Sequence, residues 1–117
     1  MNGFGPYLRA CREKLREKDR RYSVRQVAGR VGIEPAYLSK IEREDVAPPS
    51  EATIRKLAAE LGEDPDVLLA MAGKVSTDLQ AIIREHPTLF AQLIRELEGA
   101  PEDAILRVVR EVRDGDW

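Results

Sequence analysis

The chain has very few of the residues that mark catalytic or metal-binding proteins. It contains one cysteine, Cys11, and one histidine, His86. No set of Cys, Asp or Glu with the spacing of metal ligands accompanies His86. There is no glycine-rich phosphate loop and no Ser or Cys nucleophile with a plausible base. We therefore expect no catalytic residue, no metal and no cofactor, and we predict that the protein is not an enzyme.

Long apolar runs are also missing. No stretch of about 18 apolar residues is present, which predicts no membrane span. The N-terminus lacks a basic start followed by an apolar stretch, so it does not read as a secretory signal. A single cysteine fits a reducing compartment, and we predict a cytoplasmic protein. Cys11 falls on an expected helix, where a small packing residue is favoured over a reactive thiol.

Aromatic residues make up only 5% of the chain, so a core must be built from aliphatic side chains. The formal net charge is −2, but its distribution is uneven. Residues 1–43 hold 11 Lys and Arg against 5 Asp and Glu, whereas residues 44–74 hold 3 against 7 and residues 75–117 hold 5 against 9. A basic N-terminal third predicts a face that binds a polyanion. The alternative is that Arg9, Arg12, Arg20 and Arg21 only solvate a helix and its exit.

The most informative segment reads as two short helices joined by a tight turn. Ser23 is a good N-cap, and a stripe of apolar residues follows it at helical spacing. The stripe consists of Val24, Val27, Ala28 and Val31. Gly32 stands where a chain leaving a helix needs a positive φ angle, and Pro35 suits the first position of a new helix. The inward face of that second helix consists of Leu38 and Ile41. This pattern is typical of a DNA-binding helix-turn-helix.

The segment resembles the phage-repressor/Cro-like (Xre) family over roughly residues 8–69. The resemblance is carried by S-V-R-Q-V-A, the turn V-G-I, Y-L-S-K-I-E-R, and P-S-E-A-T-I-R-K-L-A-A-E-L-G with D-P-D-V-L-L behind it. It implies DNA binding through the helix at 35–43. Two positions depart from the family. Val24 stands where Gln is frequent, which puts one polar DNA contact in doubt. Glu44 stands where Gly often follows the recognition helix, which predicts a different helix exit.

The resemblance also implies which residues meet DNA. It places Glu34, Pro35, Ala36 and Lys40 at the positions that usually face base edges. Lys40 can donate to guanine O6 and N7. Pro35 and Ala36 either pack on thymine methyl groups or only start the helix, and Glu34 either accepts from cytosine N4 or caps the helix. The positions better suited to phosphate contacts are Arg25, Tyr37, Ser39 and Arg43. With so few polar base contacts, recognition should depend partly on DNA shape.

An ion pair between the first and the recognition helix is a further implication of the resemblance. In the family an Arg late in the first helix pairs with a Glu near the end of the recognition helix. The matching residues here are Arg16 and Glu42, although the connection is one residue longer than usual. The alternative is that they are two unrelated surface charges.

The whole chain is predicted to be all-α, with eight helices and no strand. The expected helices cover about residues 6–18, 24–31, 35–43, 50–61, 64–73, 76–85, 87–98 and 102–113. We expect residues 1–74 to form a five-helix Cro/repressor-like DNA-binding domain. Residues 75–117 then supply about three C-terminal helices, whose apolar stripes are too large to be buried among themselves. We predict that this segment forms a homodimer interface or binds a partner. The residues expected in the dimer interface are Phe90, Ile94, Val109 and Trp117. The alternative is that the tail folds back to complete a monomer's core.

Together these features predict a sequence-specific regulator of transcription that binds double-stranded DNA. It would be a dimeric repressor that reads a palindromic operator, with its two recognition helices about 34 Å apart. The alternative is an antitoxin-like or adaptor protein whose C-terminal helices bind a protein partner, with DNA binding serving autoregulation.

Overall fold

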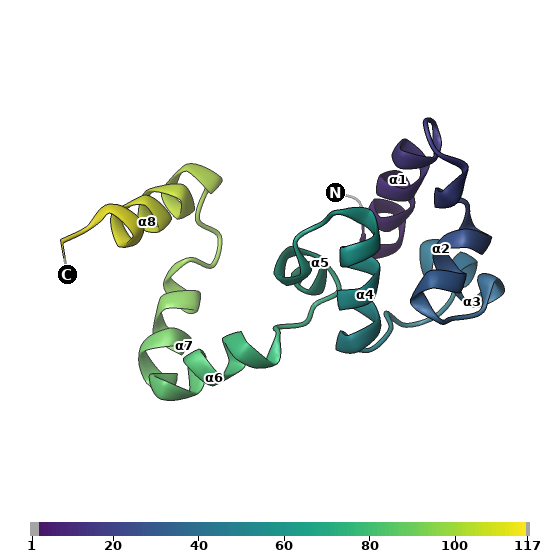
Figure 1. Cartoon of the computed structure of the whole chain (residues 1–117). Helices are drawn as coiled ribbons and strands as arrows, with labels where there is room; N and C mark the ends of the chain where they lie inside the picture. The colour runs from purple at the N-terminus through teal and green to yellow at the C-terminus, as the bar shows by residue number, and fades with distance from the viewer. Residues whose placement is uncertain (1–2, 117) are drawn as a thin grey trace. The chain divides into compact units, whose positions relative to one another are not determined.

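The computed structural model describes residues 3–116 of the chain and is built from helices (Figure 1). They are α1 (Phe4–Arg16), the short 3-10 helix η1 (Arg20–Tyr22), α2 (Val24–Val31), α3 (Pro35–Glu42), α4 (Glu51–Leu61), α5 (Pro65–Met71), α6 (Thr77–Glu85), α7 (Pro87–Glu96) and α8 (Glu102–Asp114). No strand occurs within residues 3–116, so the all-α prediction is confirmed. Trp117, expected in a dimer interface, lies outside the described residues.

Side-chain caps fix the starts of several helices. Ser23 accepts a hydrogen bond from the backbone N–H of Gln26 at the start of α2, and Ser50 does the same for Thr53 in α4. These bonds satisfy N–H groups that have no partner inside the helix. Gly32 ends α2 with φ 86°, the left-handed conformation that a residue without a Cβ adopts at little cost. The turn between the two motif helices therefore forms as the sequence predicts.

The first helix differs from its expected bounds. It begins at Phe4 instead of Pro6, with Gly3 as its N-cap. A proline within the first helical turn is tolerated because the N–H groups there have no intrahelical acceptor. The helix also ends earlier, at Arg16. The chain then forms η1, whose N-cap Asp19 accepts a hydrogen bond from the N–H of Arg21.

The hydrophobic core lies entirely within α1–α5. Its buried members are Phe4, Leu8, Val27, Ala28, Val31, Leu38, Ile41, Ile54, Leu57, Ala58, Leu61, Leu68 and Leu69. Of the inward-facing residues predicted for the motif, Val27, Ala28, Leu38 and Ile41 are at most 1% exposed, Val31 is 3% exposed, and Val24 is half-buried. This core, aliphatic except for Phe4, holds α2 and α3 in place against α1 and α4.

The chain separates into two compact units, Met1–Thr77 and Asp78–Trp117. The expected boundary lay three residues earlier. Thr77 belongs to the first unit because its N–H and hydroxyl both donate to Glu51 Oε1, at 3.2 and 3.1 Å. Ser76, just before it, is only 1% exposed. The first residue of α6 is therefore tied to the start of α4.

No described residue of α6, α7 or α8 is buried. Large apolar side chains are instead exposed along these helices. They include Ile82, Leu89, Leu93, Ile94, Ile105, Leu106 and Val109. Of the residues predicted for a dimer interface, Ile94 is 59% and Val109 51% exposed, and Phe90 is half-buried. Within the described residues, no helix has both the length and the apolar character needed to cross a membrane.

Cys11 is half-buried, and its thiol donates to Glu63 Oε1 at 2.9 Å. The other oxygen of the same carboxylate accepts from the Tyr7 hydroxyl at 3.2 Å. Burial, together with the hydrogen bond to Glu63, raises the pKa of the Cys11 thiol to about 11. The thiol is therefore protonated at neutral pH, and a protonated thiol is a poor nucleophile. This favours the packing role over the reactive one.

Candidate nucleic-acid interface

The outer face of α3 carries the side chains that are most available to a ligand. Leu38 and Ile41 turn inward and are at most 1% exposed. Ala36, Lys40 and Arg43 are exposed and follow one another at helical spacing of four and three residues. One side of α3 is therefore fixed in the core, and the opposite side is presented to the surroundings.

The remaining predicted contact residues vary in how available they are. Arg25 and Glu34 are exposed, whereas Pro35, Tyr37 and Ser39 are half-buried. Pro35 occupies the first position of α3, and the Glu34 side chain makes no capping hydrogen bond. The interpretation that the Glu34 side chain caps α3 is therefore not supported. Tyr37 packs against the core, so part of its ring has a structural role.

Glu42 forms its ion pair with Arg12 and not with Arg16. Arg12 Nε donates to Glu42 Oε2 at 2.7 Å, and Nη2 donates to Oε1 at 2.9 Å. A third bond runs from Arg12 Nη1 to the carbonyl of Tyr22, at 3.1 Å. Both ionic side chains are buried, with Arg12 2% and Glu42 5% exposed. The pair joins α1 to α3, and the hydrogen bonds to Glu42 raise the pKa of Arg12.

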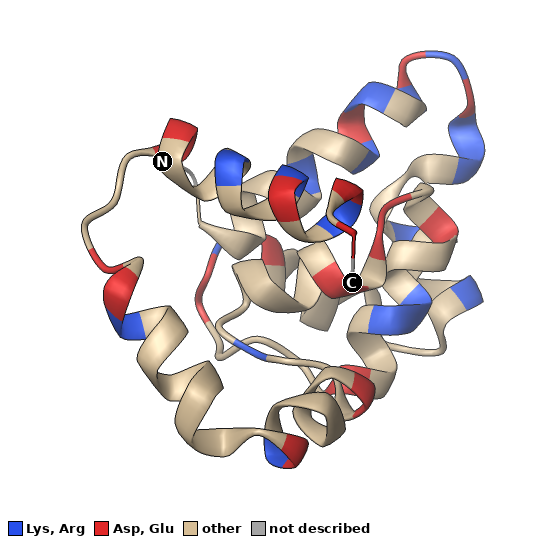
Figure 2. Cartoon of the chain, turned by 90° about the vertical axis from the view of Figure 1, so that its left-hand side faces the viewer, with Lys and Arg blue, Asp and Glu red and all other residues tan. Residues whose placement is uncertain are grey.

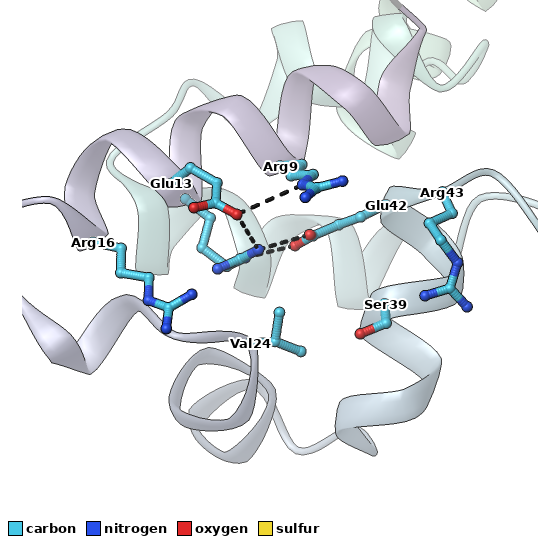
Figure 3. A pocket seen from close by; sticks show the side chains of 8 residues that line it. Arg9, Glu13, Arg16, Val24, Ser39, Glu42 and Arg43 are labelled. Atoms are coloured by element: carbon cyan, nitrogen blue, oxygen red, sulfur yellow. Dashed lines mark hydrogen bonds and ion pairs between the residues drawn. The ribbon is translucent and has the colours of Figure 1, made fainter.

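The Arg16 prediction is therefore wrong, and helical periodicity explains why. Arg12 follows the buried Leu8 by four residues, which puts it on the inward face of α1. Arg16 lies one turn further on, at the exposed end of the helix. It lines the same hollow as Glu42, but no hydrogen bond or ion pair joins the two (Figure 3).

This hollow, of about 390 Å³, is a basic depression that sequence reasoning did not identify. It is lined by Arg9, Arg12, Glu13, Arg16, Val24, Ser39, Glu42 and Arg43 (Figure 3). Arg9 is partly neutralised by Glu13 at 3.6 Å, and Arg43 pairs with Asp45 at 2.9 Å. The sequence does contain a signal for this hollow: the spacing of Arg9, Arg12 and Arg16 places three arginines on one face of α1. The hollow brings arginines from α1 beside Ser39 and Arg43 of the motif.

Many basic residues of the first unit have an acidic neighbour. Both signs of charge alternate along the end of α1 and the segment that follows it (Figure 2). Arg21 pairs with Asp19 at 2.8 Å, and Arg30 pairs with Glu60 at 2.6 Å. Such exposed pairs add little stability but reduce the positive field. Within residues 3–116, no ion pair is recorded for Arg16, Arg25 or Lys40, which leaves these charges available.

Glu44, directly after α3, adopts the left-handed conformation with φ 60°. The expectation of a different helix exit is therefore wrong, because Glu44 takes the conformation that a glycine would take. Its carboxylate accepts a hydrogen bond from the N–H of Gly5 at 3.2 Å. Gly5 lies in the first turn of α1, where N–H groups need an external acceptor and negative charge is favoured. A Cβ on Gly5 would lie 2.4 Å from the carbonyl oxygen of Ile41, so α1 and α3 approach closely here.

We expect Glu44→Ala to destabilise the first unit by about 1 kcal/mol, because it removes the acceptor for Gly5 and keeps the left-handed backbone. Glu44→Gly loses the same acceptor but relieves about 1 kcal/mol of backbone strain. Urea unfolding should therefore rank wild type and Glu44→Gly close together, with Glu44→Ala below both. An alanine variant as stable as the wild type would show that the Gly5 bond contributes nothing.

These features define a helix-turn-helix domain: a core-fixed α2, a left-handed glycine turn and an α3 with an exposed polar face. Comparison with known sequences agrees. The helix-turn-helix family profile matches residues 13–68. The chain is 40% identical over 75 residues to the uncharacterized HTH-type transcriptional regulator RghRB of Bacillus subtilis (strain 168). It is 37% identical over 75 residues to the HTH-type transcriptional repressor RghR of the same organism.

The family match over residues 13–68 and the two relatives confirm the resemblance to Xre/Cro-like helix-turn-helix regulators seen in the sequence. Each alignment covers 64% of this chain and 50% or 52% of the relative. The chain thus spans about half the length of the curated relatives it matches. No solved structure matches the chain significantly.

Proposed function

We propose that the chain is a sequence-specific regulator of transcription that binds double-stranded DNA through α3. The observation that carries this proposal is the exposed face of α3, with Ala36, Lys40 and Arg43, on a helix whose other face is locked into the core. An α-helix fits the major groove, and its exposed side chains can then reach base edges. The match to the helix-turn-helix family and the names of the relatives support the same function.

Within this interface, Lys40 is the best candidate for reading a base. It is exposed, and within residues 3–116 no acidic side chain forms an ion pair with its ammonium group. The first turn of the same helix can approach neighbouring bases. It contains Pro35 and Ala36, and Glu34 precedes it as the N-cap residue. Arg43 is better suited to a phosphate contact, because it lines the basic hollow. A DNA phosphate would then replace Asp45 as the partner of its guanidinium. Arg25, Tyr37 and Ser39 complete the proposed phosphate contacts.

Selection of bound sequences from a random duplex pool tests the proposal directly. We expect a defined consensus whose two halves are related by a palindrome. A pool that remains random after selection, at moderate salt, would contradict sequence-specific binding. The same experiment gives the spacing of the half-sites, which should be one DNA turn.

Lys40→Ala is expected to cost about 1–3 kcal/mol of binding free energy and to relax preference at one base pair. Arg43→Ala should instead weaken selected and scrambled duplexes about equally, because a phosphate contact carries no sequence information. Fluorescence anisotropy titrations with both duplexes measure the two effects. Lys56→Ala, at an exposed lysine of α4 that is not a proposed contact, serves as the control. Equal loss for both duplexes with Lys40→Ala would remove it from base recognition.

We further propose that the protein acts as a homodimeric repressor, with the C-terminal helices as its interface. The exposed apolar side chains of α7 and α8 support this, since a chain rarely leaves so many uncovered. A two-fold dimer would present two copies of α3 to a palindromic operator. The repressor role is suggested by the name of one relative.

A second candidate function rests on the same exposed helices. An antitoxin-like or adaptor protein would use them to bind a different protein and would bind DNA to regulate its own gene. The two candidates are separated by the mass of the purified chain in solution: a homodimer favours the first, and a monomer favours the second.

A further inference from the structure

Packing inside the second unit leaves the apolar faces of its helices largely uncovered. No described residue of α6, α7 or α8 is buried, although each helix has apolar residues at helical spacing. Their lengths are 9, 10 and 13 residues. Isolated helices shorter than about 12–15 residues are marginal in water, and protein helices gain most of their stability from a covered apolar face. An external surface that covered these faces would stabilise the three helices.

Helix α8 carries the clearest information about that surface. Ile105, Leu106 and Val109 form an apolar stripe, and they are 38%, 41% and 51% exposed. Glu102 and Asp103 lie in the first turn, and Arg113 lies in the last. At 100° per residue, Glu102 and Arg113 lie only about 20° apart around the helix, in line with the apolar stripe between Val109 and Leu106. The stripe therefore has an acidic residue at its start and a basic residue at its end.

This charge pattern is self-complementary. When two identical helices pack antiparallel through the same stripe, the first turn of one meets the last turn of its partner. The midpoint between Glu102 and Arg113 lies beside residue 108, the centre of α8. An antiparallel pair centred there brings Glu102 of each copy against the partner's Arg113. A parallel pair would instead place like charges at the same level.

We infer that α8 pairs antiparallel with α8 of a second copy of this chain, with Ile105, Leu106 and Val109 in the seam and two symmetric Glu102–Arg113 ion pairs at its ends. The inference rests on the homodimer proposed above and specifies its geometry. Arg113 pairs with the neighbouring Asp114 at 2.9 Å in the single chain. Both side chains of that pair are more than half exposed, so Arg113 can exchange Asp114 for Glu102 at little cost.

Charge reversal in the full chain tests this inference. Glu102→Arg or Arg113→Glu alone creates two like-charged contacts in the dimer, and each should weaken self-association by roughly tenfold in analytical ultracentrifugation. An equimolar mixture of the two variants should associate as strongly as the wild type, because both contacts in the mixed dimer again join opposite charges. Glu85→Arg, the same charge change at the exposed end of α6, should have little effect.

The double variant, Glu102→Arg with Arg113→Glu, separates pairing from an effect on the helix itself. Each reversal opposes the helix dipole, so a helix-only effect predicts that the double variant associates more weakly than either single one. Antiparallel pairing predicts that it regains wild-type association. No rescue in the double variant or the mixture would overturn the inference while leaving a homodimer possible through other residues. A wild-type chain that is monomeric, or that binds only a different protein, would overturn both, and the duplex selection would still report on DNA binding.

Discussion

Arg12→Ala is expected to destabilise the first unit by about 3–5 kcal/mol, since it leaves the buried carboxylate of Glu42 without its charge partner. Glu42→Ala should cost a similar amount for the reciprocal reason. The guanidinium of Arg12 donates two bonds to Glu42, one to the carbonyl of Tyr22 and a longer one to Glu13, and the alanine variant loses all of them. Small domains have a total stability of only about 5–15 kcal/mol, and the loss would be a large part of it. Urea unfolding followed by circular dichroism measures the effect.

Two further variants show whether the cost comes from the unpaired charge. Arg16→Ala, on the exposed end of the same helix, should change stability by less than about 0.5 kcal/mol. The double variant Arg12→Met with Glu42→Leu removes both charges and should be clearly more stable than either single alanine variant. If Arg16→Ala proved as damaging as Arg12→Ala, the ion pair described here would not be the one that holds α1 to α3.

The contrast between Arg12 and Arg16 shows which features of the site could be predicted from the sequence and which could not. The apolar positions of α2 and α3 follow from a 3.6-residue period, and Val27, Leu38 and Ile41 are buried as expected. The ion pair between α1 and α3 also forms, but the family pattern pointed to an arginine one turn too late. Choosing the right arginine required the level at which Glu42 meets α1, because Arg12 and Arg16 lie one turn apart on the same side of that helix.

Glu44 could not have been predicted from its neighbours. Local sequence rules reserve the left-handed conformation mainly for glycine, and they give no reason for a glutamate there. The reason lies 39 residues away, at the N–H of Gly5. Strain at one residue is offset by a bond formed only after α1 and α3 have packed. The C-terminal helices pose the opposite problem: their period predicts each helix, but a period does not say what covers its apolar face.

Removing residues 78–117 is expected to leave the first unit folded but to lower its affinity for a palindromic duplex by about 10²–10⁴-fold. The fold should survive because every buried apolar residue recorded for the described chain lies between Phe4 and Leu69. Affinity should fall because two linked copies of α3 bind a two-part site cooperatively, whereas a single copy gains nothing from the second half-site. Circular dichroism reports the fold, and anisotropy titrations report the affinity.

A half-site duplex provides the matched control for this truncation. The truncated and full-length chains should bind one half-site about equally, because each uses a single α3 there, and only the palindrome should separate them. Lys40→Ala should weaken both chains on both duplexes, since it acts at the base and not at the dimer contact. If the truncated chain dimerises as well as the full chain, or binds the palindrome as tightly, the C-terminal helices are not the dimerisation element. The two copies of α3 would then have to be joined through the first unit itself.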